Sequence, residues 1–393
     1  MTFILTGLLI LSALARRKLT LSVFDQLNVV YIKECIMIYT VIIGINDYIP
    51  QNFFPIFVFS YLSWILLLYL IGRFFSERYY SAVNKMCLWL ETGSTSLRII
   101  MIIFGLVLVI FLMGGLTTGG GDARLLLAKQ LRVIEPIYLF AQQLAIYALL
   151  YKFIILKKRW YVILILAMLI PLFYVGGKST IMVVAYAVNY LVFRNFMKVS
   201  IFSIFVLIAI ITIGITASIF INYDINNVIG ALELLIFRIQ MDSDIYFLYF
   251  QQGFGSSVNI TSGLAYLFGP IFKLLGFGYM VEMNIGAQLS SLVFGKQVFT
   301  GPNAHLPFVL YSLSSIEAVV FSGAIYFFLT AIFMIHVFKG TGKDFISATF
   351  IALSISIFNR YNFDPPALTL LIVELVLFSM LLRVIRTIVY KPK

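Results

Sequence analysis

Long apolar stretches recur along nearly the whole chain, and they restrict its fold more than any other feature. A helix needs about 20 residues to cross a hydrocarbon layer about 30 Å thick, and somewhat fewer where the bilayer thins. The expected spans are 2–15, 27–46, 54–72, 99–115, 137–156, 160–175, 179–193, 200–220, 306–335, 345–358 and 366–383. The sequence therefore predicts one all-α membrane domain over residues 1–393, with about eleven transmembrane helices.

Composition excludes an ordinary soluble domain. Hydrophobic residues make up 62% of the chain and charged residues only 11%, whereas a soluble domain carries about 25% charged residues. The opening stretch 2–15 has no basic residues before it and no small-residue cleavage site after it. We therefore interpret it as the first span and not as a signal peptide.

Basic residues orient the expected bundle, because cytoplasmic connections of membrane proteins are rich in lysine and arginine. Most of them fall on one side of the alternation of spans. These are Arg16, Arg17, Lys18, Arg73, Arg78, Lys85, Arg98, Lys157, Lys158, Arg159, Arg194, Lys198, Lys339, Lys343, Arg383, Arg386, Lys391 and Lys393. That side is predicted to be the cytoplasm, with the N-terminus outside and the C-terminus inside. Anionic lipid at the cytoplasmic face accounts for the net charge of +12, so a nucleic-acid partner is not expected.

Two long connections, 116–136 and 221–306, are predicted to lie outside the cytoplasm. Glycine and proline punctuate the second one, which indicates short helices separated by turns. Its expected helices are 231–252, ending at Gly253, then 264–275 and 285–293. The sequence thus predicts a helical lid over the outer end of the bundle.

Eight basic residues face outward in this topology, against the general rule. They are Arg124, Lys129, Arg132, Lys178, Arg238, Lys273, Lys296 and Arg360. The simpler interpretation of each is a residue that solvates a loop. The functional one is that several bind an anionic, lipid-linked substrate: Lys129 and Arg132 share one helical face, and Lys178 opens a helix whose positive end favours phosphate.

Three outward residues are candidates for chemistry. Arg238 and Asp242 are four residues apart, which fits either an internal ion pair or an arginine on a pyrophosphate with a carboxylate left for a sugar. His305 ends the run Gly301-Pro302-Asn303-Ala304-His305. Its imidazole either takes a proton from a sugar hydroxyl, with Asn303 beside it, or only makes hydrogen bonds at a helix start.

Other polar residues bear on rival functions. Glu34, Glu317 and Glu374 lie in or near spans, where acids are costly and often serve proton-coupled transport. Glu34 follows Lys33, and the pair is expected near the cytoplasmic interface. The two histidines, His305 and His336, fall on opposite sides, so no metal site is expected. Cys35 and Cys87 are not expected to form a disulfide.

Taken together, the layout resembles the O-antigen polymerases, the Wzy-type polymerases of oligosaccharide repeat units. The resemblance rests on the short first span followed by Arg16-Arg17-Lys18 and Ser22-Val23-Phe24-Asp25, and on the glycine-rich basic loop 119–132. It rests also on Gly176-Gly177-Lys178-Ser179, the late loop with Arg238, and the segment 301–306. The family usually has arginine where Lys178 stands.

The resemblance implies a lipid-linked glycosyltransferase of the GT-C type in the bacterial inner membrane. It would transfer a growing glycan from undecaprenyl pyrophosphate onto a new lipid-linked repeat unit at the periplasmic face. The implied catalytic residues are His305, Arg238 and Asp242, and the implied pyrophosphate or substrate contacts are Arg124, Lys129, Arg132, Lys178, Asn303 and Arg360. No metal or other cofactor is implied.

The implied partners are the lipid-linked oligosaccharides, membrane lipid, a chain-length regulator and a flippase. Two other functions stay open. An O-antigen ligase would carry out nearly the same chemistry on a different acceptor. A flippase or transporter would be expected to show internal repeats and short loops.

Overall fold

A computed structural model gives the structure of the chain. It describes residues 2–38, 46–92, 105, 135–166, 178–198, 229, 244–258, 260, 262–277, 285–294, 305–313, 316–340, 342, 345–373 and 376. All regular elements within these residues are helices, so the all-α prediction is confirmed for this part of the chain. The number of spans is not tested, because 99–115 and 200–220 lie almost wholly outside the described residues.

The first half of the chain supplies α1 (Thr2–Arg16), α2 (Gln26–Ile36), the 3-10 turn η2 (Asn46–Tyr48), α3 (Phe53–Thr92), α6 (Glu135–Ile154) and α8 (Lys178–Phe193). The second half supplies α11 (Asp244–Tyr246), the π-turn η4 (Phe247–Gln251), η5 (Phe254–Ser257), α12 (Gly263–Leu274), α13 (Ile285–Phe294), α14 (Leu306–Tyr311), α15 (Ile316–Lys339) and α16 (Phe345–Phe358). A further helical stretch covers 365–373.

The helix α3 forms the centre of the bundle. It packs against α1, α6, α14, α15 and α16. Its 40 residues make a rod about 60 Å long, at 1.5 Å per residue. The sequence predicted a span over 54–72, and the helix that contains it continues to Thr92. The residues after Gly72 are more polar but remain helical, because no proline interrupts them. The one proline of this helix, Pro55, lies in the first turn, where proline is tolerated.

Gly72 marks a close approach between two helices. A Cβ atom there would lie 3.2 Å from the Lys18 Cβ and 3.5 Å from the Ala15 carbonyl oxygen. The absence of a side chain at this position therefore lets the end of α1 rest directly on α3.

The predicted span 306–335 is in fact two helices. α14 ends at Tyr311 and α15 begins at Ile316. The intervening sequence is Ser312-Leu313-Ser314-Ser315, and serine favours turns because its hydroxyl competes for nearby backbone groups. This break leaves α14 as a short separate helix that follows His305 directly.

Several other expectations are met. The helices at 137–156, 179–193 and 345–358 correspond to α6, α8 and α16. In the predicted lid, 264–275 and 285–293 correspond to α12 and α13, and Gly253 follows η4 with a left-handed φ of 74°.

Burial raises the pKa of the Tyr249 hydroxyl in η4, although a hydrogen bond to Ser312 opposes the rise.

Two of the described helices, α3 and α15, are long and apolar enough to cross a membrane. α3 exposes apolar side chains at Phe59, Leu62 and Leu66, three to four residues apart, which places them on one face. Along α15 the exposed side chains are Ile316, Val320, Phe321, Phe328, Leu329, Ile332 and Ile335. Exposed apolar faces of this extent are typical of surfaces that contact lipid or another protein.

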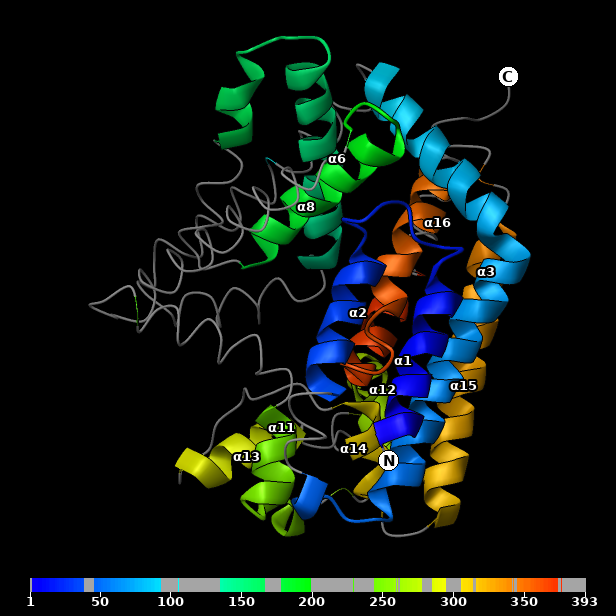
Figure 1. Cartoon of the computed structure of the whole chain (residues 1–393), viewed down its shortest axis with the longest axis vertical. Coiled ribbons are helices and arrows are strands. Elements are labelled where there is room, and N and C mark those ends of the chain that lie inside the picture. The colour runs from blue at the N-terminus through cyan, green and yellow to red at the C-terminus, as the bar shows by residue number, and fades with distance from the viewer. Residues whose placement is uncertain are drawn as a thin grey trace.

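The bundle has two distinct ends (Figure 1). At the lower end, α1 begins and α11, α13 and α14 gather. The upper end holds the last turns of α3, the described residues 155–166 that follow α6, and the start of α16. Exposed basic residues near the upper end include Arg78, Lys157, Lys158, Arg159 and Lys339. There Arg78 and Lys85 donate to the carbonyls of Lys339 and Gly342.

A buried ion pair joins α1 to α2. The Arg16 Nη2 lies 2.5 Å from the Glu34 Oε1, and the Ser12 hydroxyl donates to the other oxygen at 3.1 Å. Both charged side chains are at most 2% exposed. The sequence placed Arg16 among the basic residues of the cytoplasmic side and Glu34 beside Lys33; the structure shows that Arg16 and Glu34 are both buried and pair with each other. α1 and α2 are close enough for the Arg16 guanidinium to reach the Glu34 carboxylate.

Replacing Glu34 by glutamine should destabilise the protein strongly. It leaves the Arg16 guanidinium buried without a countercharge, which costs about 3–5 kcal/mol. The double change Arg16→Met with Glu34→Leu should recover most of this loss, because apolar side chains of similar volume replace a buried pair well. Denaturant unfolding of the purified protein in detergent measures both. Equal instability of the single and double variants would contradict the prediction.

Candidate functional site

His305 stands at the lower end of the bundle, immediately before α14. Its backbone is extended, and its carbonyl accepts from the N–H groups of Phe308 and Val309 at 2.9 and 3.2 Å. Pro307 favours a helix start here because its fixed φ suits the first turn. The Leu306 N–H donates to the Asn362 carbonyl at 2.8 Å. This last bond ties His305 to the segment that follows α16.

Aromatic rings enclose the imidazole. The ring of Phe363 lies edge-on, with centroids 5.0 Å apart, and the ring of Tyr246 lies at 5.7 Å. His305 is only 2% exposed. The site therefore keeps bulk water away from the imidazole, which strengthens any electrostatic interaction made there.

The same region holds buried polar atoms without partners. The amide groups of Asn359 and Asn362 and the Tyr246 hydroxyl make no hydrogen bond with the described residues. A buried polar group left in this state costs about 1–3 kcal/mol, so such atoms are expected to meet water or a ligand. Asn359 and Asn362 are about one helical turn apart in the chain, and the Asn362 backbone touches the start of α14.

Tyr246 belongs to the described part of the predicted lid. Its hydroxyl is buried, and burial raises the pKa of this group. Tyr246 is therefore a neutral phenol at physiological pH. It packs against Phe53 of α3 and Phe308 of α14 at ring-centroid distances of 6.2 and 4.4 Å. These contacts attach the lid to the central helix beside His305.

The structure brings two of the predicted site residues, His305 and Arg360, into one region, whereas Lys178 lies on another helix. Arg360 is exposed and lies between Asn359 and Tyr361, in the segment that contacts His305. Lys178 is the first residue of α8, and α8 packs against α6. The remaining predicted residues, Arg124, Lys129, Arg132, Arg238, Asp242 and Asn303, lie outside the described residues.

Sequence reasoning missed Tyr246, Asn359 and Asn362. A signal for the two asparagines was present: the run Asn359-Arg360-Tyr361-Asn362-Phe363-Asp364 places several polar groups in one short connection between apolar stretches. No comparable signal marked Tyr246, because a tyrosine in an apolar stretch is ordinary core material.

The burial of His305 can be tested with diethyl pyrocarbonate, since the chain has only two histidines. His336, in the last turn of α15, is exposed. In the purified protein the reagent should modify His336 quickly and His305 slowly, as peptide mass spectrometry would measure. Unfolding the protein should equalise the rates. Equal rates in the folded protein would show that His305 is accessible.

The arrangement has defined chemical capacities. The neutral imidazole can accept a proton, the phenol and amides can donate hydrogen bonds to hydroxyl or phosphoryl oxygens, and the Arg360 guanidinium can hold a phosphate. Comparison with known protein families, with curated proteins and with solved structures found no match to this chain.

Proposed function

We propose that the chain is a multi-pass protein of the bacterial inner membrane that polymerises lipid-linked oligosaccharide repeat units at the periplasmic face. The observation that carries the proposal is a buried histidine, His305, at one end of an apolar bundle, next to the segment 359–363 that also carries the exposed Arg360. The exposed basic residues near the opposite end support an orientation with that end in the cytoplasm.

In the proposed reaction, a hydroxyl of the acceptor sugar attacks the anomeric carbon of the donor glycan. The new carbon–oxygen bond forms as the bond to undecaprenyl pyrophosphate breaks, and the pyrophosphate leaves with the bonding electrons. His305 takes the hydroxyl proton. The neutral Tyr246 and the two buried asparagines would donate or accept hydrogen bonds with sugar hydroxyls.

Positive charge is needed where the pyrophosphate develops its charge. Arg360 is the described residue proposed for this role, and its exposure suits contact with a lipid headgroup at the bundle surface. Arg124, Lys129, Arg132, Lys178 and Arg238 remain proposed contacts on sequence grounds, as do Asn303 and Asp242 for the sugars.

A second function, transport of the lipid-linked oligosaccharide, is favoured by one observation. The Arg16–Glu34 pair is buried inside the bundle, and buried charges in membrane proteins often belong to transport paths. Gene deletion separates the possibilities. Loss of a polymerase leaves lipid A capped with a single repeat unit, whereas loss of a flippase or a ligase leaves lipid A without any.

The role of His305 has a specific test. His305→Ala should slow polymerisation by about 10²–10⁴-fold, the usual contribution of a general base. His305→Gln should not restore activity, because an amide cannot accept the proton. His336→Gln is the matched control and should leave activity unchanged, since His336 lies at the far end of α15. The assay follows polymer formation from purified lipid-linked substrate. Near-normal activity of His305→Gln would remove the base role.

The orientation can be measured by cysteine labelling. Ser256 and Arg159 are both exposed, Ser256 in η5 of the lid and Arg159 in the connection after α6. In a Cys35→Ser, Cys87→Ala background, Ser256→Cys should react with a membrane-impermeant reagent applied from the periplasmic side. Arg159→Cys should react only after the inner membrane is opened. The reverse pattern would invert the proposed topology.

A further inference from the structure

A turn with three successive positive charges follows α6 at the upper end of the bundle (Figure 1). α6 ends at Ile154, and a second helical stretch covers 161–166. Between them the Lys158 N–H donates to the Lys152 carbonyl at 3.3 Å, and Lys157 has a left-handed φ of 51°. That conformation is uncommon for a residue with a Cβ atom. The turn therefore has a defined backbone, which sets the direction of its side chains.

No acidic residue lies near this turn along the chain. Lys157, Lys158 and Arg159 are all exposed, and the sequence contains no aspartate or glutamate from residue 136 to residue 223. At the same end of the bundle, Glu91 of α3 is already paired with Arg194 at 2.9 Å. The three charges of the turn are therefore available to an anion from outside the chain.

Aromatic and apolar side chains follow the charges directly. Trp160 is 54% exposed and stacks on Tyr161, with ring centroids 3.8 Å apart. Ile163 and Leu166 are 66% and 51% exposed. Positions 160, 163 and 166 are spaced three residues apart, so their side chains share one broad helical face. The segment 157–166 thus exposes positive, aromatic and apolar side chains in that order.

The opposite side of the same segment is attached to the bundle. Tyr161 and Leu164 pack against the hydrophobic core, and Ile165 is only 7% exposed. The Lys152 ammonium in the last turn of α6 lies 5.6 Å from the centre of the Tyr161 ring, which is a cation–π contact. The exposed side is therefore held in a fixed place beside the end of α6, and a surface fixed in advance loses less entropy on binding.

The combination of charge and apolar surface selects the kind of partner. A nucleic acid or an acidic protein surface matches the cations but leaves the apolar side chains of Ile163 and Leu166 in water. One leaflet of a lipid bilayer supplies both surfaces, because anionic headgroups lie directly above hydrocarbon. Indole rings concentrate at the boundary between these two layers. Trp160 stands between the cations and the apolar residues, which is the same order.

We propose that the segment 157–166 binds an anionic phospholipid of the membrane leaflet next to the upper end of the bundle. The three cations of the turn contact the headgroup phosphate, and the planar donors of Arg159 suit two of its oxygens. Trp160 lies at the level of the glycerol backbone, and Ile163 and Leu166 contact the acyl chains. The proposal requires that the chain lies in a membrane, and it does not depend on the proposed glycosyltransferase activity.

Fluorescence quenching by labelled lipid tests the proposal in the full-length protein. The chain has three tryptophans, so the signal of Trp160 is the difference between the unmodified protein and Trp160→Phe. Both are reconstituted in equimolar bilayers of phosphatidylglycerol and phosphatidylcholine, with bromine on the acyl chains of one lipid or of the other. Brominated phosphatidylglycerol should quench Trp160 more strongly. Equal quenching by the two lipids would show no preference for the anionic headgroup, and quenching by neither would place Trp160 outside the bilayer; each result overturns the proposal.

Charge variants show whether the cations cause the preference. The triple variant is Lys157→Asn, Lys158→Gln, Arg159→Gln, in which asparagine suits the left-handed backbone at 157. Its preference for phosphatidylglycerol should disappear, since each charge contributes up to about five-fold. Arg159→Lys keeps the charge and should retain most of the preference. Lys273→Gln is the matched control, because Lys273 is also exposed but belongs to α12, and it should behave as the unmodified protein. A preference that persists in the triple variant would overturn the assignment.

Ionic strength separates recognition of the headgroup charge from contact with the acyl chains. Salt shortens the screening distance from about 10 Å at about 0.1 M to about 3 Å at about 1 M, so the preference for phosphatidylglycerol should fall in the unmodified protein. Quenching by brominated phosphatidylcholine should persist, because contact of the indole ring with hydrocarbon does not depend on charge. A preference that salt leaves unchanged would contradict binding through the three cations.

Discussion

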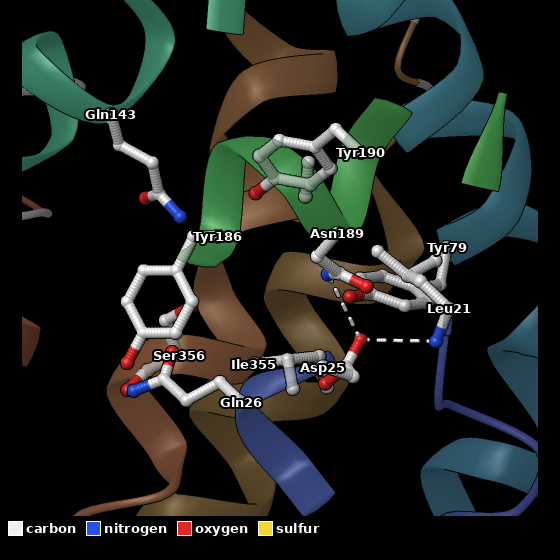
Figure 2. Close-up of a pocket in the computed structure, with 11 residues that line it drawn as sticks. Leu21, Asp25, Gln26, Tyr79, Gln143, Tyr186, Asn189, Tyr190, Ile355 and Ser356 are labelled. Carbon is white, nitrogen blue, oxygen red and sulfur yellow. Dashed lines mark hydrogen bonds between the residues drawn. The ribbon is translucent and has the colours of Figure 1, made fainter. Parts of the chain in front are cut away.

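Packing against α3 is the constraint on which the rest of the described structure depends. Helices from both halves of the chain, α1 and α6 as well as α14, α15 and α16, contact this one element. Phe53 at its start touches Tyr246, Phe250 and Phe308, which belong to the His305 region. Tyr79, much further along, lines a small pocket beside Asp25, at the start of α2 (Figure 2). One continuous helix thus fixes the relative positions of both polar regions.

Helix positions could be predicted because apolar runs of a given length have few other ways to satisfy their backbone groups. The C-terminal end of α3 could not be predicted from apolar runs. Its second half has charged residues such as Arg73 and Arg78 on an exposed face, while Tyr79, Val83 and Met86 are buried. This pattern belongs to a helix that packs on one side only, and it looks like a polar connection when hydropathy alone is considered.

The sequence likewise identified some of the site residues and not others. His305 was identifiable because histidine is rare in this chain and its chemistry is distinctive. The pairing of Arg16 with Glu34 was not predicted, because the two residues are 18 positions apart on different helices and counting charges along a sequence does not reveal such a pair. The contribution of Tyr246, Asn359 and Asn362 depends on which helices are neighbours, and that information appears only in the folded chain.

The unbroken course of α3 makes the fold sensitive to a change in the length of this helix. Each residue of an α-helix turns its successor by about 100°. One residue inserted or lost just after Gly72 would therefore rotate Tyr79 and Glu91 away from their neighbours, even though no side chain in contact had been replaced. The hydrogen bonds from Tyr147 and Arg194 to Glu91 would go with them. The contacts on both halves of this helix therefore depend on its exact length as well as on its side chains.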